Sequence, residues 1–256
     1  MISYDDYGSG DRAVIALHGV GSGRRSWVGQ AGAIVDAGWR LIAVDAPGYG
    51  KTPLPDEPGF GPHVEAVILA LDLLELDEAV ICGHSLGGMT AQEVYARAPE
   101  RVSGLVLSAT SPAFGKPDGD FQKKFVEARL KPFEDGKSMP EVAAASARNL
   151  LGPKPRDGAE LEIIAEMSQV SIEAFSLAVR TLTAFDRRAN LPNITVPTIC
   201  IAGDHDRNSP APMVEKMASK IPGAEYVCLE DVGHMAPVEA SERFNEALVG
   251  FLGRVG

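Results

Sequence analysis

The sequence predicts an α/β fold, a mostly parallel twisted sheet with helices on both of its faces. Three observations lead to this prediction. Short, continuous apolar runs such as residues 13–17 are typical of strands that are buried on both faces. Segments with apolar residues at every third or fourth position separate these runs and indicate helices. The length of 256 residues and the hydrophobic fraction of 45% are sufficient for one continuous core.

The first half of the chain alternates between the two patterns. The apolar run that ends at Cys82 stops at Gly83, and Pro99 stops the helical pattern that begins near Leu86. The expected order is strand, strand, helix, strand, helix and strand, over residues 13–17, 40–44, 64–74, 79–82, 86–98 and 102–109. This alternation favours parallel strands joined by crossover helices.

The stretch from about residue 111 to 188 contains helix-like segments and no convincing strand. The expected helices cover residues 121–130, 139–151, 159–166 and 172–185. The alternation then returns, with strands over 196–202 and 226–229 and helices over 210–220 and 239–252. We therefore predict a core of residues 1–110 and 189–256, into which residues 111–188 are inserted as a helical lid over the strand ends, where such sheets bind ligands.

Charge and composition exclude several classes of protein. The net charge of −11 argues against nucleic-acid binding, which needs a surface rich in Lys and Arg. The first residues have neither the basic start nor the apolar run of a secretory signal, and no stretch approaches the roughly 18 apolar residues of a membrane helix. Cys82, Cys200 and Cys228 each lie in an apolar run, where we expect buried, reduced thiols. These features predict a cytoplasmic protein.

Ser85 is the candidate nucleophile, because Gly83-His84-Ser85-Leu86-Gly87 lies between a predicted strand and a predicted helix. A serine on such a tight turn has a strained backbone and needs small neighbours, which the two glycines supply. The start of the helix adds free N–H groups and the positive end of its dipole. The alternative is a glycine-rich turn whose serine has no chemical role.

A serine needs a base to become nucleophilic near neutral pH, and His234 is the best placed of the five histidines. It lies in the loop between the last predicted strand and the last predicted helix, and in a parallel sheet that loop emerges at the same edge as Ser85. The side chain of His84 is expected to point away from the adjacent Ser85. The remaining histidines are assigned to a turn, a helix start and a loop, at His18, His63 and His205.

The base in turn needs a carboxylate that accepts a hydrogen bond from its far nitrogen and stabilises the imidazolium. Gly203-Asp204-His205-Asp206 follows a predicted strand at the same edge of the sheet. Asp206 is the preferred acid because it has room to reach back toward His234, and Asp204 is the second candidate. The carboxylate without the catalytic role is expected to bond within the turn.

An oxyanion that forms during the reaction needs hydrogen-bond donors. Leu17-His18-Gly19-Val20-Gly21 follows the first apolar run, and its glycines permit a backbone that is turned toward the site. We predict that the N–H groups of Val20 and Leu86 form the oxyanion hole, in which one donor contributes about 2.7–4 kcal/mol. An ordinary strand-to-helix turn is the alternative interpretation of the Val20 segment.

Over essentially its whole length, the chain resembles the α/β-hydrolase superfamily, and it is also similar to 3-oxoadipate enol-lactonases and related small carboxylesterases. The order Ser…Asp…His is that of α/β-hydrolases. The resemblance implies the α/β-hydrolase fold and excludes the branches whose nucleophile is an aspartate. It rests on His18-Gly19, Asp45-Ala46-Pro47-Gly48-Tyr49-Gly50, Gly83-His84-Ser85-Leu86-Gly87-Gly88, Gly203 with Asp206 and Pro210, and Gly233-His234.

These residues predict a serine hydrolase that cleaves a small carboxylic ester or lactone through an acyl-enzyme, without cofactor or metal. A C–C bond hydrolase, a thioesterase and a cofactor-free perhydrolase remain alternatives on the same three residues. A protein of different class, which has the hydrolase shape but binds a small molecule with little turnover, also remains. The oligomeric state is left open.

The predicted lid has a local excess of basic residues in an acidic protein. A solvated helix surface is the simpler interpretation. The alternative is that one arginine, Arg129 or Arg148, turns inward and binds a substrate carboxylate. Met139, Met167, Phe175 and Met235 are candidates for an apolar pocket lining. The basic residues are Lys116, Lys123, Lys124, Arg129, Lys131, Lys137, Arg148, Lys154 and Arg156.

Overall fold

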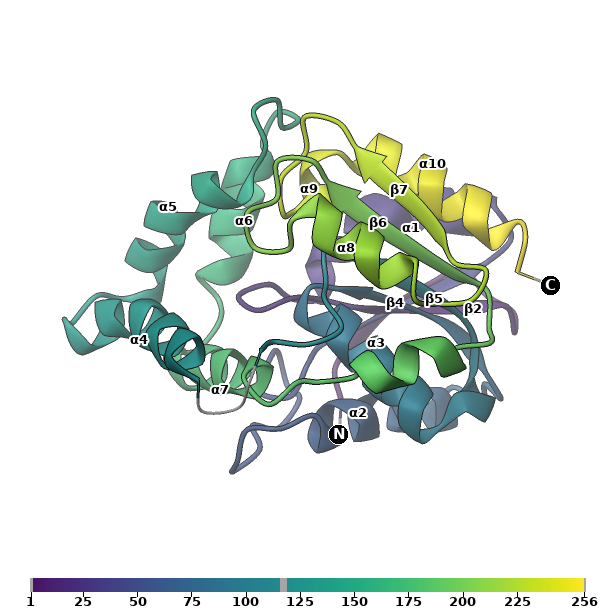
Figure 1. Ribbon diagram of the computed structural model, residues 1–256, viewed down its shortest axis with the longest axis horizontal. Helices are drawn as coiled ribbons and strands as arrows, with labels where there is room; N and C mark the ends of the chain where they lie inside the picture. The colour runs from purple at the N-terminus through teal and green to yellow at the C-terminus, as the bar shows by residue number, and fades with distance from the viewer. Residues whose placement is uncertain (1, 116–118, 256) are drawn as a thin grey trace.

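A computed structural model describes residues 2–115 and 119–255, and within them the chain forms one seven-stranded sheet (Figure 1). The order across the sheet is β1-β3-β2-β4-β5-β6-β7, in which only β1 runs antiparallel to its neighbour. The prediction of a mostly parallel sheet is therefore confirmed. The strands are β1 (Tyr4–Tyr7), β2 (Ala13–Leu17), β3 (Arg40–Val44), β4 (Ala79–His84), β5 (Val102–Ser108), β6 (Thr198–Gly203) and β7 (Glu225–Leu229).

Helices cover both faces of this sheet because successive strand residues point to opposite sides. Ile15 and Ile81 pack in one apolar cluster with the helices α2 (Gly61–Leu73), α3 (Leu86–Arg97) and α8 (Ala211–Ala218). Val14 and Val80, their immediate chain neighbours, pack in a second cluster with α1 (Val28–Asp36) and α10 (Ser241–Leu252). The alternation explains why the central strands are largely apolar on both faces.

A group of four helices lies between β5 and β6 in the chain and forms the left part of the molecule in Figure 1. They pack around a third apolar cluster that also contains Leu86 and Met89 of α3. The stretch is helical as predicted, and its function as a lid stays a prediction. The helices are α4 (Asp120–Glu134), α5 (Met139–Leu150), α6 (Ala159–Met167) and α7 (Ile172–Leu182).

The two edges of the sheet depart from the expectations. Strand β1 was not predicted, because a segment with two adjacent aspartates does not look like a buried strand; it pairs only with β3. The expected burial of all three cysteines is wrong for Cys228, which is exposed on the edge strand β7, whereas Cys82 and Cys200 are buried. Lys116 lies outside the described residues.

None of the helices in the described part of the chain is both long and apolar enough to cross a membrane.

Candidate active site

Ser85 lies at the turn between β4 and α3, with backbone angles φ 53° and ψ −115°. This positive φ is strained for a residue with a side chain. Hydrogen bonds hold both backbone polar groups of Ser85. Its N–H donates to the carbonyl of Ser108 at 2.9 Å, and its carbonyl accepts from the Thr110 hydroxyl at 2.8 Å. The end of the neighbouring strand β5 and the residues that follow it therefore fix the position of Ser85.

The glycines around Ser85 are required by close backbone contacts. A Cβ at Gly83 would lie 2.2 Å from the carbonyl oxygen of Gly87, and a Cβ at Gly87 would lie 2.1 Å from that of Leu17. No side chain fits at such distances. The helix α3 can therefore begin directly beneath the strand ends only with glycine at these positions, as the sequence predicted.

His234 and Asp206 are paired on the side of the sheet that carries β6 and β7. The Nδ1 atom of His234 lies 2.8 Å from Oδ2 of Asp206, and both side chains are buried. The other oxygen of Asp206 accepts the N–H groups of Asn208 at 2.8 Å and Ser209 at 3.0 Å. These bonds fix the carboxylate, so that Nδ1 of His234 carries the proton and Nε2 remains available as an acceptor.

Two opposing effects act on the Asp206 carboxyl group. Burial alone would raise its pKa, but the charge of His234 and the hydrogen bonds from His234, Ser209 and Asn208 outweigh burial. The pKa of Asp206 is therefore below its ordinary value, and the group is ionised at neutral pH.

Asp204 has a different role. Its Oδ1 atom accepts the N–H of Val232 at 3.1 Å, which connects the loop after β6 to the loop that precedes His234. Of the two candidate acids, the structure brings Asp206 to His234. The expectation that the other carboxylate bonds within its own turn is wrong, because Asp204 bonds to the neighbouring loop instead.

Glu239 was not predicted from the sequence, yet its buried carboxylate holds the segment that carries His234. One oxygen accepts the N–H groups of Gly233 and Met235, both at 3.0 Å, and these residues flank His234. The other oxygen accepts the N–H of Gly152, just after α5, at 2.6 Å. Burial raises the pKa of Glu239 above its ordinary value, while the three N–H groups partly oppose this. Glu239 is thus a positioning residue that connects the His234 loop to the helical segment.

We expect Glu239→Gln to lower turnover about ten- to a hundredfold, because a displaced His234 no longer meets Ser85 in reactive geometry. The amide would place an NH₂ group against a backbone N–H, which costs about 1–3 kcal/mol of folding free energy. Steady-state kinetics well below the melting temperature and thermal unfolding would measure both effects. Glu242→Gln, at an exposed carboxylate on α10, is the matched control. A kcat equal to that of the control, with only a lowered Tm, would refute the positioning role.

The loop after β2 approaches Ser85 from the other side. A Cβ at Gly19 would lie 3.1 Å from Cβ of Ser85, so the glycine lets the two segments touch. His18 stabilises the loop: its Nδ1 donates to the Gly19 carbonyl at 2.9 Å, and its Nε2 accepts the N–H of Ala46 at 3.0 Å. Burial lowers the pKa of His18, which keeps the ring neutral for this double role.

The two predicted oxyanion donors, Val20 and Leu86, directly follow the two residues that touch, Gly19 and Ser85. Val20 lines the cavity described below, whereas the Leu86 side chain is buried beneath it. Within the described part of the chain, neither backbone N–H has a protein acceptor. Both groups are thus free to donate to a ligand, and their role as an oxyanion hole stays a prediction.

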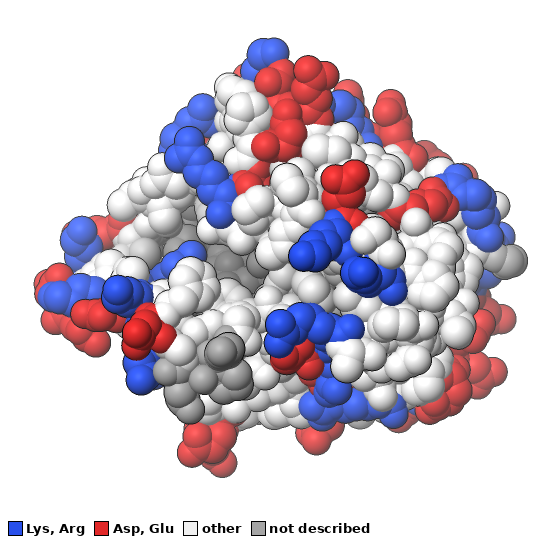
Figure 2. Space-filling view, viewed as in Figure 1, with Lys and Arg blue, Asp and Glu red and all other residues white. Residues whose placement is uncertain are grey.

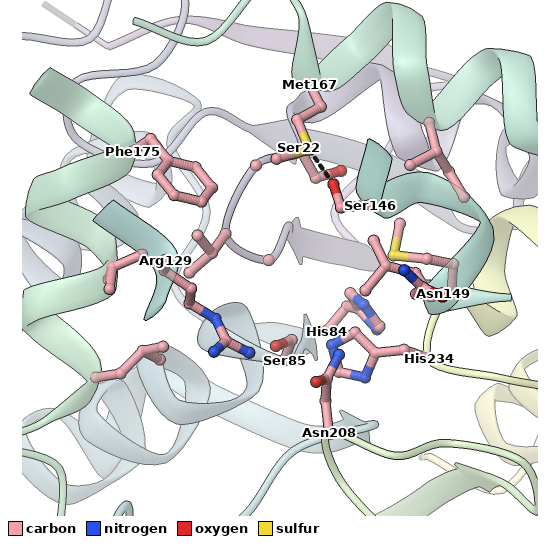
Figure 3. A pocket seen from close by; sticks show the side chains of 18 of the residues that line it. Ser22, His84, Ser85, Arg129, Ser146, Asn149, Met167, Phe175, Asn208 and His234 are labelled. Atoms are coloured by element: carbon pink, nitrogen blue, oxygen red, sulfur yellow. Dashed lines mark hydrogen bonds between the residues drawn. The ribbon is translucent and has the colours of Figure 1, made fainter. Parts of the chain in front are cut away.

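A cavity of about 980 Å³ lies between the sheet and the helical segment, and Ser85 and His234 both line it. Figure 2 shows the hollow in the left half of the molecule, surrounded mainly by uncharged surface. Most of the wall is apolar; Phe175 and Met167 lie opposite the end with Ser85 and His234 (Figure 3). Met235 also lines it, but Met139 packs in the core of the helical segment instead.

His84 contradicts the expectation that its side chain points away from the site. Its ring lines the cavity and packs against that of His234, with ring centroids 5.0 Å apart. Burial, together with the nearby His234, lowers the pKa of His84 to about 3. His84 is therefore a neutral packing partner of His234, and it is not available as a base near neutral pH.

No group of three or more metal-binding side chains is found within residues 2–115 and 119–255.

Comparison with known proteins agrees with this geometry. Residues 14–247 match the family described as "Alpha/beta hydrolase family". Two 2-hydroxy-6-oxononadienedioate/2-hydroxy-6-oxononatrienedioate hydrolases are similar in sequence. The one from Pseudomonas sp is 28% identical over 99% of this chain and 92% of its own, and the one from Cupriavidus pinatubonensis is 30% identical over 98% and 90%.

A solved structure of an α/β-hydrolase is also similar to this chain. The enol-lactonase from Burkholderia xenovorans LB400 superposes with a TM-score of 0.86 at 25% identity, covering 99% of this chain and 96% of its own. The resemblance to α/β-hydrolases and enol-lactonases that the sequence predicted is thus confirmed. The chain belongs to the alpha/beta hydrolase family.

Proposed function

We propose that the protein is a serine hydrolase that cleaves a small carboxylic ester or lactone through an acyl-enzyme. One observation carries the proposal: strained Ser85 shares a cavity with His234, whose Nδ1 is hydrogen-bonded to buried, ionised Asp206. Three residues in these states match the roles of nucleophile, base and orienting acid. Similarity to an enol-lactonase supports the lactone part of the proposal.

In the first half of the reaction, Oγ of Ser85 forms a bond to the substrate carbonyl carbon while its proton moves to Nε2 of His234. The N–H groups of Val20 and Leu86 donate to the oxyanion, and Asp206 stabilises the imidazolium. The intermediate collapses by breaking the carbon–oxygen bond of the ester. The proton on Nε2 passes to the leaving oxygen, which departs as an alcohol or, from a lactone, remains attached to the acyl group.

In the second half, water gives a proton to Nε2 of His234 and adds to the acyl carbon. The bond to Oγ of Ser85 breaks, and the proton on Nε2 returns to Oγ. The product is a carboxylic acid, which ionises at neutral pH. No group besides these residues and water is needed to balance the reaction.

Hydrolysis of a carbon–carbon bond beside a ketone is the second candidate function. It is favoured by the two relatives, whose named substrates carry hydroxyl, ketone and carboxyl groups but no ester, so that their hydrolysis must break a carbon–carbon bond. The thioesterase and perhydrolase alternatives use the same acyl-enzyme and remain predictions.

A substrate panel tests the proposal. It contains 4-nitrophenyl esters of increasing acyl length, lactones, acyl thioesters and 2-hydroxy-6-oxononadienedioate. We expect ester or lactone turnover, an early burst of 4-nitrophenolate where deacylation is slow, and a mass increase equal to the acyl group on the peptide that contains Ser85.

The other outcomes separate the alternatives. Turnover of the dienedioate alone would assign the protein to carbon–carbon hydrolysis. Binding of panel members without turnover or burst would overturn the enzymatic proposal and favour a binding protein of the hydrolase shape. A chelator control is included and is expected to leave the rates unchanged.

A further inference from the structure

The wall of the cavity is largely apolar, but Arg129 on α4 brings a positive charge into it. Figure 3 shows the guanidinium group pointing across the cavity toward Ser85. The side chain is half-buried, and burial lowers the pKa of the guanidinium from its ordinary value, although an arginine remains charged. A charge in this position needs a partner, because desolvation of an unpaired ion is costly.

The orientation of Arg129 is fixed by its own helix. The guanidinium carbon lies 3.5 Å from the centroid of the Phe125 ring, one helical turn earlier. This stacking is a cation–π contact that covers one face of the guanidinium plane. The N–H groups lie in that plane, so the stacking leaves them available to an acceptor in the cavity.

No protein acceptor serves these N–H groups. Within residues 2–115 and 119–255, Arg129 makes no hydrogen bond and no ion pair. Other half-buried arginines of the same chain behave differently, since each binds a carboxylate: Arg24, Arg40, Arg101 and Arg187. Arg129 is therefore in the environment of a paired arginine, but the paired group is not supplied by the described part of the chain.

The other charged side chains around the cavity do not substitute for Arg129. Arg25, Lys137 and Arg207 line it but are exposed, and water solvates their charges. Two acidic side chains line the wall, both on α6. Glu162 is paired with Arg156, and Glu166 lies against the Gly23 segment, where a Cβ would be 2.9 Å from its carboxylate. Within the described residues, neither glutamate forms an ion pair with Arg129.

Arg148, the other arginine considered from the sequence, does not reach the cavity. Its side chain is exposed and donates to the carbonyl of Gly152 at 3.1 Å. The structure thus separates the two candidates.

We propose that Arg129 binds a carboxylate of the substrate, so that the preferred substrate is an ester or lactone with a second, anionic end. This inference rests on the proposed function, because it assigns the reacting carbonyl to Ser85. A guanidinium can form two parallel hydrogen bonds to a carboxylate, which gives both affinity and orientation. The apolar wall between Arg129 and Ser85 would contact the carbon chain that joins the two ends.

The test compares pairs of substrates that differ only in charge. One pair, 4-nitrophenyl hydrogen adipate and its methyl ester, has the carboxylate in the acyl half; 4-acetoxybenzoate and its methyl ester have it in the leaving half. We expect the wild type to prefer the anionic member of one pair. In Arg129→Met, the ratio of kcat/KM for the anionic over the neutral member should fall about ten- to a hundredfold, mainly through KM.

Two further variants make the test specific. Arg129→Lys should recover part of the ratio, because an ammonium restores the charge without the two parallel bonds. It also replaces the Met variant if the latter fails to fold. Arg180→Gln, at an exposed arginine on α7, is the matched control and should change neither rate. An unchanged ratio in Arg129→Met, or an equal loss for both members of each pair, would overturn the proposal.

A binding measurement separates this inference from the proposed function. Calorimetric titration with adipate requires no turnover, and we expect its dissociation constant to rise about ten- to a hundredfold in Arg129→Met. If no ester is hydrolysed but this rise is found, the proposed reaction fails and the carboxylate site stands. If esters are hydrolysed but adipate binds wild type and variant equally, the site fails and the reaction stands.

Discussion

Replacement of Ser85 by alanine is expected to lower ester turnover by about 10⁶, to the level that the remaining binding and oxyanion groups sustain. The change removes only Oγ, and the backbone bonds of residue 85 to Ser108 and Thr110 are kept. Activity assays with purified enzyme, combined with labelling by a fluorophosphonate, would measure the loss. Retained turnover within tenfold of the wild type would rule out Ser85 as nucleophile.

A second substitution at the same position tests the strain. Ser85→Gly also lacks the nucleophile, but glycine adopts a positive φ at no steric cost. We therefore expect the unfolding free energy of Ser85→Gly to exceed that of Ser85→Ala by about 1 kcal/mol, which thermal unfolding would show as a higher Tm. Equal stability of the two variants would show that the turn at Ser85 is not strained in solution.

Asp206→Asn is expected to lower turnover by about 10⁴, because an asparagine stabilises the tautomer of His234 that cannot accept the serine proton. The amide oxygen can still accept the N–H groups of Asn208 and Ser209, so the loop should keep its shape. The matched control is Asp204→Asn, in which the amide oxygen can still accept from Val232, and turnover should stay within about threefold of wild type. The reverse pattern would transfer the catalytic role to Asp204.

The lowered pKa of Asp206 also predicts how stability depends on pH, which a comparison of wild type with Asp206→Asn can test. Because the pKa of Asp206 is lowered in the folded protein, its ionised form stabilises the fold above the unfolded pKa of about 3.9. That contribution is lost as the pH falls through the lower, folded value. The difference in unfolding free energy between wild type and Asp206→Asn should therefore be constant above about pH 5 and shrink below about pH 4. A difference that grows on acidification would contradict the lowered pKa.

The fold was predictable where local pattern and burial agree. The central strands are apolar on both faces, and the helices of the inserted segment follow their 3.6-residue spacing, so both were found from the sequence. The edge strand β1 was not, because it is half solvated and carries no such pattern, whereas the strand at the other edge, β7, was predicted and only the exposure of Cys228 was missed. Tyr4–Tyr7 has two aspartates, and on β7 Cys228 is the exposed residue of a run whose other members are wholly or partly buried.

The site was predictable to the extent that chain order determines it. The positions of Ser85, Asp206 and His234 follow from strand ends that meet at one edge of the sheet. The orientation of His84 and the contacts of Glu239 depend on long-range packing, which adjacent letters do not encode. A lone glutamate five residues after the histidine, within the otherwise apolar stretch 235–240, is the signal in the sequence that could have indicated Glu239.

The meeting of the helical segment with the His234 loop has a consequence for chimaeric proteins. Exchanging the segment between β5 and β6 with that of a relative would replace much of the cavity wall and leave Ser85, Asp206 and His234 in place. The junction on the His234 side uses backbone groups, the Leu150 carbonyl and the Gly152 N–H, which any donor sequence supplies. Side chains of the segment are constrained there as well: Arg156 donates from Nε to the Val238 carbonyl at 2.6 Å, and Lys154 pairs with Asp231 at 2.5 Å. The tightest constraint is at residue 152, where a Cβ would lie 2.2 Å from the carbonyl oxygen of Asp231. A donor segment with glycine at that position should be accepted, and one without it should misplace the base.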